Sequence, residues 1–253
     1  MSDVSRETPA TPALPGSARR LFPADRLTLA ERYADLLATD GVLRGLIGPR
    51  EAPRLWDRHL LNCAALSEAV PRQATVADVG SGAGLPGLVL AIARPDVQMT
   101  LLEPLLRRTR FLDEVVASLG LADQVEVRRG RAEEMAGSER FAVVTARAVA
   151  PLERLLGWCM PLVDADGVFL AMKGSGAADE VAEAAARLDA LGCAPPELLE
   201  LGRDVLAEPV RVVRVAWADP GRVGWPRPAA GSTSPAGRRR SAGERTRRTR
   251  RKS

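Results

Sequence analysis

The feature that most constrains the fold is a glycine-rich turn, Gly80-Ser81-Gly82-Ala83-Gly84-Leu85-Pro86-Gly87. A short apolar run, Thr75-Val76-Ala77-Asp78-Val79, precedes this turn, and a helical pattern follows it as far as about Arg94. Glycine lets the backbone turn sharply and approach a ligand closely, and the free N–H groups at a helix start attract negative charge. The sequence therefore predicts a strand, a ligand-binding turn and a helix, with Pro86 at the helix start, where its missing N–H costs nothing.

Strand and helix patterns alternate through the rest of the central segment. Further strands are predicted at 97–102, 125–128, 141–146 and 168–172, and further helices at 106–119, 151–162 and 177–191. Residues 198–201 and 210–217 are expected to form a closing antiparallel hairpin. This alternation predicts an α/β fold with a mainly parallel, doubly wound, Rossmann-like sheet.

Composition divides the chain into four parts. Residues 1–24 are polar and rich in Pro, Ser and Thr, and we expect them to be disordered. Residues 25–72 carry two helical patterns, the first opening with the capping-box spacing of Thr28 and Glu31, and are predicted to form a small helical N-terminal addition. Residues 73–219 hold the Rossmann-like domain, and 220–253 are predicted to be a disordered basic tail.

Charge is distributed very unevenly along the chain. The net charge is +4, but residues 221–253 contain eleven Arg or Lys and one Glu, so residues 1–220 are mildly acidic. No apolar run approaches the roughly 20 residues of a membrane span, and the start lacks the pattern of a secretory signal, so we expect a cytoplasmic protein with no membrane contact. Three scattered cysteines and a single histidine disfavour disulfides and a zinc site, and no metal is predicted.

Acidic residues around the glycine turn narrow the choice of ligand. Gly82, Gly84 and Gly87 match the dinucleotide pattern G-x-G-x-x-G, and Asp78 extends the motif to D-x-G-x-G-x-G, which is typical of S-adenosylmethionine sites. Glu103 ends the next strand, where a carboxylate reaches ribose hydroxyls. A nicotinamide or flavin dehydrogenase is the alternative, but little chain remains for a substrate domain. The motif therefore predicts S-adenosylmethionine as cofactor and a methyltransferase.

The methyl acceptor is constrained by what the chain lacks. No Asn-Pro-Pro-Tyr-like segment follows the fourth strand, where methylases of exocyclic amines carry one. Cys159 lies inside a helical pattern and is predicted to be a buried structural thiol instead of a nucleophile. Because the sulfonium donor is already activated, the protein mainly aligns the acceptor. A ring nitrogen with a free lone pair, such as guanine N7, is compatible with this chain.

Motifs along the chain resemble those of the bacterial 16S ribosomal RNA guanine-N7 methyltransferase family, also called the glucose-inhibited division protein B family. They occur in order between about Leu27 and Trp217: Arg58 to Cys63, Asp78 to Gly87, Leu101-Leu102-Glu103, Arg107 to Leu112, Arg131-Ala132-Glu133-Glu134, Thr145-Ala146-Arg147-Ala148 and Met172-Lys173-Gly174. The chain departs from the family at Asn62-Cys63, where Asp-Ser is frequent.

The resemblance implies a class I S-adenosylmethionine-dependent methyltransferase fold and a guanine in the decoding-region loop of 16S ribosomal RNA as the acceptor. It also implies cofactor contacts at Gly80, Leu85, Ala132, Glu133 and Arg147, with Glu103 on the ribose. The glycine motif itself adds Asp78, Gly82 and Gly84 as predicted cofactor-binding residues.

Three further residues are candidates for positioning the acceptor. Arg147 either pairs with an acid such as Glu133 or touches cofactor or RNA phosphate. His59 either is structural or lines the acceptor site. Lys173 either contacts phosphate or is simply solvated. The basic tail is expected to attract RNA phosphates without base specificity. Two other functions stay open: methylation of a different RNA, a protein or a small molecule, and a non-catalytic RNA-binding factor for ribosome assembly.

Overall fold

The computed structural model describes residues 13–147 and 149–223. Within them one seven-stranded sheet has the order β3-β2-β1-β4-β5-β7-β6. Strands β1 to β5 are mutually parallel, and β7 is antiparallel to both β5 and β6. The strands are β1 (Thr75–Val79), β2 (Gln98–Glu103), β3 (Val125–Arg129), β4 (Phe141–Arg147), β5 (Val163–Lys173), β6 (Glu197–Leu201) and β7 (Val210–Ala216). The predicted doubly wound sheet and its closing hairpin are confirmed.

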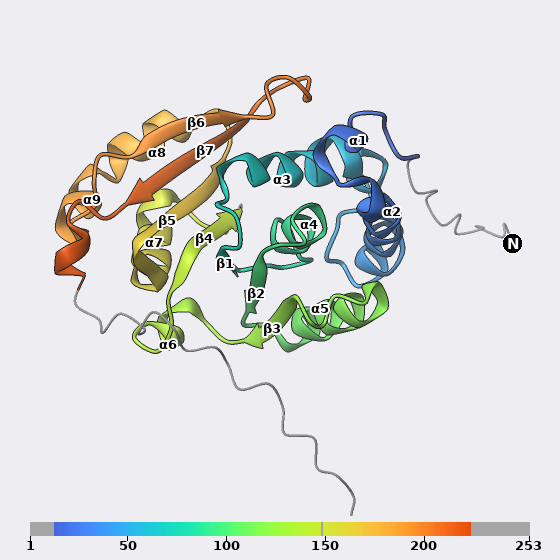
Figure 1. The fold of residues 1–253 in the computed structure, drawn as a ribbon, viewed down its shortest axis with the longest axis horizontal. Coiled ribbons are helices and arrows are strands. Elements are labelled where there is room, and N and C mark those ends of the chain that lie inside the picture. The colour runs from blue at the N-terminus through green and yellow to red at the C-terminus, as the bar shows by residue number, and fades with distance from the viewer. Residues whose placement is uncertain (1–12, 148, 224–253) are drawn as a thin grey trace, which may run out of the picture.

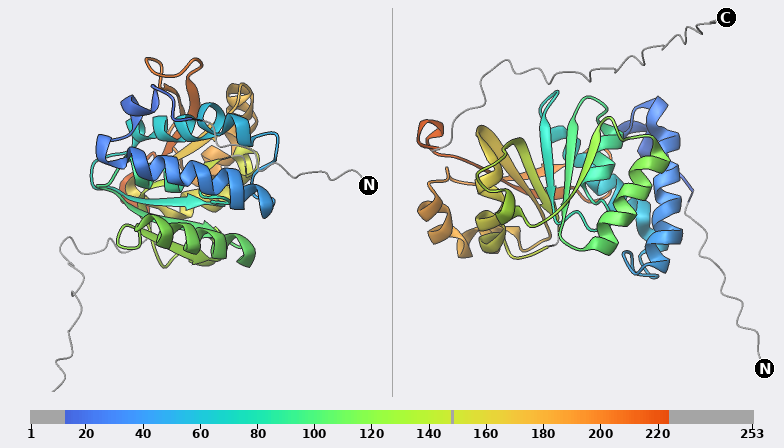
Figure 2. Two further views of the ribbon diagram at one scale, coloured as in Figure 1. Left: turned by 90° about the vertical axis from the view of Figure 1, so that its right-hand side faces the viewer. Right: turned by 90° about the horizontal axis from the view of Figure 1, so that it is seen from below.

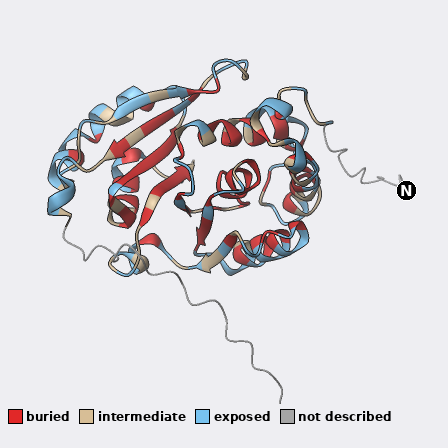
Figure 3. Cartoon of the chain, in the orientation of Figure 1, coloured by how far each residue is buried: buried red, intermediate tan, exposed pale blue. Residues whose placement is uncertain are grey.

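Helices cover both faces of the sheet, as Figures 1 and 2 show. Side chains alternate along the strands, so Val76 of β1 packs with one layer while Ala77 and Val79 pack with the other. One layer holds α2 (Leu27–Leu36), α3 (Leu61–Ala65), α4 (Gly87–Ala93) and α5 (Leu106–Leu119), and the other holds α6 (Ala132–Met135), α7 (Leu152–Cys159), α8 (Ala177–Glu183) and α9 (Ala185–Leu191). Buried residues concentrate in the strands and on the inner sides of the helices (Figure 3).

Two predicted elements of the Rossmann-like part differ most from the observed ones. Strand β5 begins at Val163 instead of at 168. Its first half contains Asp164, Asp166 and Gly167 and therefore lacks the apolar pattern from which the strand was predicted. The helix predicted over 177–191 is divided at Ala184 into α8 and α9. Cys159 is fully buried, as expected for a structural thiol.

The N-terminal addition begins earlier than predicted. A short helix, α1 (Ala18–Leu21), buries Ala18, and the buried Phe22 packs edge-on against Trp56 with ring centroids 6.4 Å apart. The predicted disorder up to residue 24 is therefore wrong for this segment, since one turn is too short to show periodicity. The capping box is also wrong: α2 starts at Leu27, so Thr28 lies inside its first turn. Residues 1–12 and 224–253 lie outside the described residues.

The second helical pattern of the addition, 54–70, is not one regular helix. A 3₁₀ turn over Ala52–Arg54 leads into a π-helix over Leu55–Leu60, and α3 then ends in a 3₁₀ turn over Leu66–Ala69. π-Helical turns are rare and are frequent at functional sites. In the described part of the chain, no helix is both long and apolar enough to cross a lipid bilayer.

Candidate active site

The glycine turn follows β1, which lies between β2 and β4 in the sheet. The strand order reverses at this point, because β2 and β3 lie on one side of β1 and β4 and β5 on the other. In open parallel sheets, ligands bind in the crevice at such a point, beyond the carboxyl ends of the strands. The turn is tied to β2 because the N–H groups of Gly80 and Ser81 both donate to the carbonyl of Leu102, at 2.8 and 3.0 Å. The fold thus places the motif at the expected edge.

Glycines of the turn have two different roles. A Cβ at Gly87 would lie 2.3 Å from Cδ2 of Leu101 and 2.8 Å from Oδ2 of Asp78, so this glycine lets α4 pack against the ends of β1 and β2. Gly82 has a left-handed φ of +60°, and the nearest atom to a Cβ there would be the carbonyl oxygen of Gly80, at 3.8 Å. Gly82 therefore presents open backbone to a ligand.

Asp78 is fully buried beneath the turn. Its Oδ2 accepts a hydrogen bond from the Gly87 N–H at 2.9 Å, while Oδ1 has no hydrogen-bond partner among the described residues. Burial raises the pKa of this carboxyl from 3.8 to about 7, against the opposing effects of the Gly87 N–H, the Ser81 hydroxyl and Arg147. A buried carboxylate oxygen without a partner fits a cationic ligand group, such as the ammonium of S-adenosylmethionine.

Glu103 is buried at the end of β2 and faces the same turn. Its Oε2 accepts from the Gly82 N–H and its Oε1 from the Leu105 N–H, each at 3.0 Å, and the Arg108 guanidinium lies 3.4 Å from Oε2. A carboxylate has about four acceptor sites, so further hydroxyl donors can be accommodated. The structure brings Glu103 to Gly82, and its contact with ribose stays a prediction.

The remaining predicted cofactor residues lie along the same edge. Leu85 is half-buried at the end of the turn, and Ala132 is buried at the start of α6, directly after β3 and its following loop. Glu133 is exposed beside it. Their contacts with a cofactor stay predictions.

Arg147 ends β4, and its guanidinium is held by the N-terminal addition. Nη2 donates to the carbonyl of Arg58 at 3.1 Å and lies 2.5 Å from Nδ1 of His59, while Nη1 donates to Sγ of Cys63 at 3.0 Å. The structure therefore brings together two predicted residues, Arg147 and His59. It shows no pairing of Arg147 with Glu133, the alternative left open by the sequence.

His59 is itself held from its other side. Its Nε2 lies 2.9 Å from Oε2 of Glu51, which belongs to the loop before the π-helix. Burial and the positive charge of Arg147 lower the pKa of His59 below 6.5, and Glu51 opposes this only partly. Because a guanidinium can only donate, Nδ1 of His59 accepts from Arg147, and this contact requires a neutral ring.

Lys173 ends β5, and within the described residues it bonds neither to Arg147 nor to His59. Its Nζ donates to the Ala150 carbonyl at 2.9 Å and to Oε2 of Glu180 at 2.7 Å, and 7% of its side chain is exposed. The interpretation of a simply solvated lysine is wrong. A phosphate contact would require this ion pair to open, because the carboxylate and the carbonyl occupy the ammonium group.

Sequence reasoning missed four residues near the site: Tyr33, Glu51, Cys63 and Glu180. Tyr33 is fully buried in α2 and donates from its hydroxyl to the Ala83 carbonyl at 2.7 Å, inside the glycine turn. The available signal was that this chain has a single tyrosine, placed in an otherwise aliphatic stripe. Buried tyrosine hydroxyls usually find a partner.

Comparisons with known proteins agree with this geometry. The family model of "rRNA small subunit methyltransferase G" (GidB) matches residues 26–204. "Ribosomal RNA small subunit methyltransferase G" of Nocardioides sp. is 66% identical over 224 residues, covering 88% of each chain. The protein of the same name from Salinispora tropica is 58% identical over 236 residues, covering 90% of this chain and 96% of the other.

Solved structures show the same fold at much lower identity. The mitomycin 7-O-methyltransferase MmcR is 21% identical, with a TM-score of 0.54 over 80% of this chain and 65% of the other. This likeness confirms the class I S-adenosylmethionine methyltransferase fold. The matching family model and the two relatives establish that the chain belongs to the family of ribosomal RNA small subunit methyltransferase G.

Proposed function

We propose that this chain transfers a methyl group from S-adenosylmethionine to N7 of a guanine in the decoding-region loop of 16S ribosomal RNA. The observation that carries the proposal is the buried Asp78 oxygen without a partner, beside the open glycine turn, in a chain of this family. The choice of N7 and of the decoding region rests on the family resemblance. Because the substrate is ribosomal RNA, we place the reaction in the cytoplasm.

The chain's own residues would bind and align the reactants. When bound, S-adenosylmethionine supplies an already activated methyl group on a sulfonium. Asp78 would face the ammonium group, Glu103 the ribose hydroxyls, and the Gly82 backbone would lie close to the cofactor. Guanine N7 attacks through an in-plane lone pair and carries no proton, so this step needs no general base. Alignment in a site that keeps Arg147 fixed is then the main catalytic contribution.

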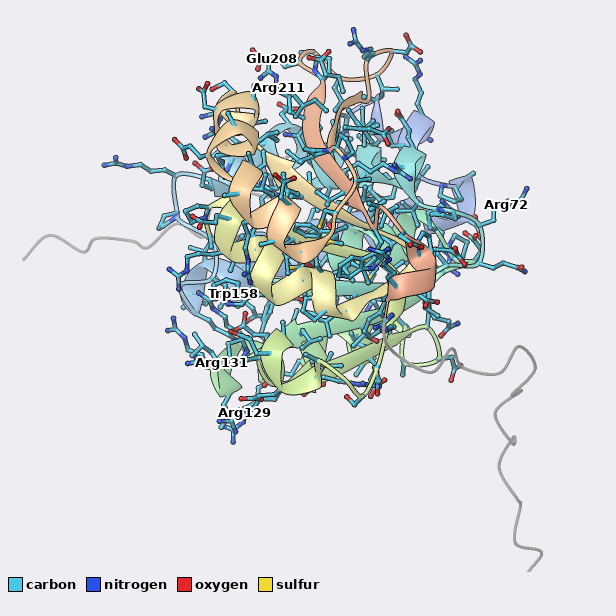
Figure 4. The ribbon with its side chains drawn as sticks, turned by 90° about the vertical axis from the view of Figure 1, so that its left-hand side faces the viewer. Arg72, Arg129, Arg131, Trp158, Glu208 and Arg211 are labelled. Atoms are coloured by element: carbon cyan, nitrogen blue, oxygen red, sulfur yellow. The ribbon has the colours of Figure 1, made fainter. Side chains whose placement is uncertain are left out.

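A basic rim beside the turn supports an RNA acceptor. Helix α5 begins with Arg107 and Arg108 and has no acidic residue in its first turn, although the positive end of a helix dipole disfavours cations there. Arg129 ends β3 and Arg131 follows two residues later; both are exposed, and Figure 4 shows both at the periphery of the molecule. Phosphate groups would compensate this concentration of positive charge.

Methyl transfer from radiolabelled donor onto small-subunit RNA, naked and assembled into particles, tests the proposal. We expect one labelled guanine in the decoding-region loop, identified as N7-methylated by mass spectrometry. Label on another RNA, on protein or on a small molecule would show a different substrate. Calorimetric binding of S-adenosylmethionine without transfer to any of them would favour an assembly factor.

We also propose that the basic tail tethers the acidic body of the protein to RNA phosphates. Nine of the last sixteen residues are Arg or Lys, without interleaved aromatic residues. Such a composition favours attraction that depends on salt and not on base sequence. The proposal rests on composition alone, because residues 224–253 of the tail lie outside the described residues.

A further inference from the structure

Three atoms from the short segment 58–63 accept hydrogen bonds from the guanidinium of Arg147. They are the Arg58 carbonyl oxygen, His59 Nδ1 and Cys63 Sγ, and they take three of the five guanidinium N–H groups. The Nε–H and the second Nη1–H have no partner among the described residues. The segment belongs to the N-terminal addition, whereas Arg147 ends the strand next to β1 in the Rossmann-like domain. The addition thus orients an arginine at the site and leaves two donors for a ligand.

The bond to Arg147 requires one particular form of His59. Nδ1 accepts a hydrogen bond only when it carries no proton, so the ring must be neutral with its proton on Nε2. The Glu51 carboxylate accepts that Nε2–H at 2.9 Å and so selects this tautomer. A carboxylate that fixes the far nitrogen of an imidazole is the arrangement by which proteins orient histidine ligands of metals.

Charged groups surround the ring on several elements. Glu51 faces it from the loop before the π-helix, Arg58 lies on the same π-helix, and Arg147 faces it from β4. Behind Arg147, the Cys63 thiol and Asp78 interact with the same guanidinium. A proton on Nδ1 would remove the acceptor and place a second cation against Arg147.

We propose that His59 is a positioning residue for methyl transfer: held by Glu51 as the Nε2–H tautomer, it orients Arg147, so that the helical addition completes the active site. This inference rests on the proposed function, because it assigns Arg147 to the methyl-transfer site. It differs from both alternatives that the sequence left open, a purely structural histidine and one that lines the acceptor site. The π-helix over Leu55–Leu60 supports it, because that turn directs both Arg58 O and His59 toward β4.

NMR of the imidazole tests the geometry without any activity. The chain contains one histidine, so ¹⁵N spectra of the full-length protein give a single imidazole. We expect the Nε2–H tautomer and a pKa below 6.5 that rises in Arg147→Ala, because a neighbouring positive charge is removed. A proton on Nδ1, or a pKa that is indifferent to Arg147→Ala, would overturn the proposal even if RNA methylation is confirmed.

Steady-state kinetics test the role in the reaction. We expect His59→Leu to lower kcat roughly 10- to 100-fold, the usual effect of removing an orienting partner, with a smaller change in KM. His59→Asn should recover most of this loss, because its amide oxygen can occupy the place of Nδ1. Equal losses in both variants would indicate a merely structural histidine. Failure of the wild type to methylate small-subunit RNA would instead refute the proposed function.

The pH profile gives a directional test. Wild-type kcat should fall as pH drops through the pKa of His59, and this acid limb should vanish in His59→Asn. Glu51→Gln keeps an acceptor for Nε2–H but removes the negative charge that favours the imidazolium. The pKa of His59 should therefore fall, and the acid limb of kcat should move to lower pH. Asp57→Asn, an exposed acid on the same π-helix, is the control and should leave the limb unchanged. If the acid limb of kcat lay at the same pH in Glu51→Gln as in the wild type, the proposed role of Glu51 in holding His59 would be contradicted.

Discussion

At the scale of single residues, the site contains a carboxyl group that the free protein stabilises poorly. Asp78 is buried, and among the described residues Gly87 donates to Oδ2 of its carboxyl group while Oδ1 has no hydrogen-bond partner. A buried carboxylate with an unpartnered oxygen costs free energy, and a bound cation would recover it. Ligand affinity at this position is therefore obtained at the expense of the stability of the free protein.

Asp78→Asn should separate these two effects. Because the folded-state pKa is raised to about 7 from 3.8, the folded protein binds the proton more tightly, and stability should fall as pH rises from about 4 to about 7. We expect the variant to lack this decline and to melt above the wild type at pH 8, yet to bind S-adenosylmethionine more weakly. Melting curves at pH 5 and 8, with calorimetry for the cofactor, measure both. A variant that melts below the wild type at pH 8 would contradict the argument.

At the scale of elements, an ion pair fixes the segment that follows β4. Oε2 of Glu180 accepts from Nζ of Lys173 at 2.7 Å and from the N–H of Leu152 at 2.8 Å, while Lys173 also holds the Ala150 carbonyl. A Cβ at Gly80 would lie 3.0 Å from Cγ2 of Val149, so the segment held by this pair also covers the glycine turn. The ends of β5 and α8 thus position the edge of the site.

Removing one partner of this pair should cost more than removing both. Glu180→Gln keeps an acceptor for Leu152 but leaves the nearly buried Lys173 ammonium without its counter-charge, and we expect a loss of roughly 1–3 kcal/mol in the free energy of unfolding. The double variant Lys173→Met, Glu180→Gln should be more stable than Glu180→Gln alone. Urea unfolding of the four proteins in the cycle measures this; additive losses would show that the pair is not coupled.

Features of the fold and the site could be predicted from the sequence where the residues that define them lie close together along the chain. Strand β1 and the glycine turn were predictable because the motif is local, and Asp78 and Glu103 lie at fixed distances from it along the chain. The contacts of Tyr33 with Ala83 and of Arg147 with His59 join residues 50 and 88 positions apart. No local pattern encodes such pairs. The π-helix was missed because its side chains repeat almost as those of an α-helix do.

At the scale of the whole molecule, the helical addition and the Rossmann-like part share one hydrophobic core. Leu37 and Leu55 of the addition belong to the same buried cluster as Ile92 of α4 and Phe111 of α5. Tyr33 and His59 extend this shared packing to the glycine turn and to Arg147. The predicted division at residues 72 and 73 therefore separates two parts of the sequence that pack as one body.

The basic tail, residues 220–253, is opposite in charge to the rest of the chain, which is mildly acidic. Truncation after Val223 removes ten of the eleven basic residues beyond residue 220 and keeps every residue that the structure describes. If the tail tethers RNA, the truncated protein should show a higher KM for ribosomal substrate at low salt and an unchanged kcat, because the catalytic residues remain. The plot of log KM against log salt should also become flatter, since fewer phosphate contacts release fewer counterions.

A tail with the same residues in scrambled order is the matched control for this truncation. Because counterion release depends on charge and not on sequence, we expect the scrambled tail to restore both the wild-type KM and its salt dependence. Replacing the Arg and Lys residues of the last sixteen by Gln should reproduce the truncation at constant length. Identical KM values for wild type and truncated protein at every salt concentration would show that the body alone binds the RNA, which would leave the rim around Arg107, Arg129 and Arg131 as its electrostatic contact.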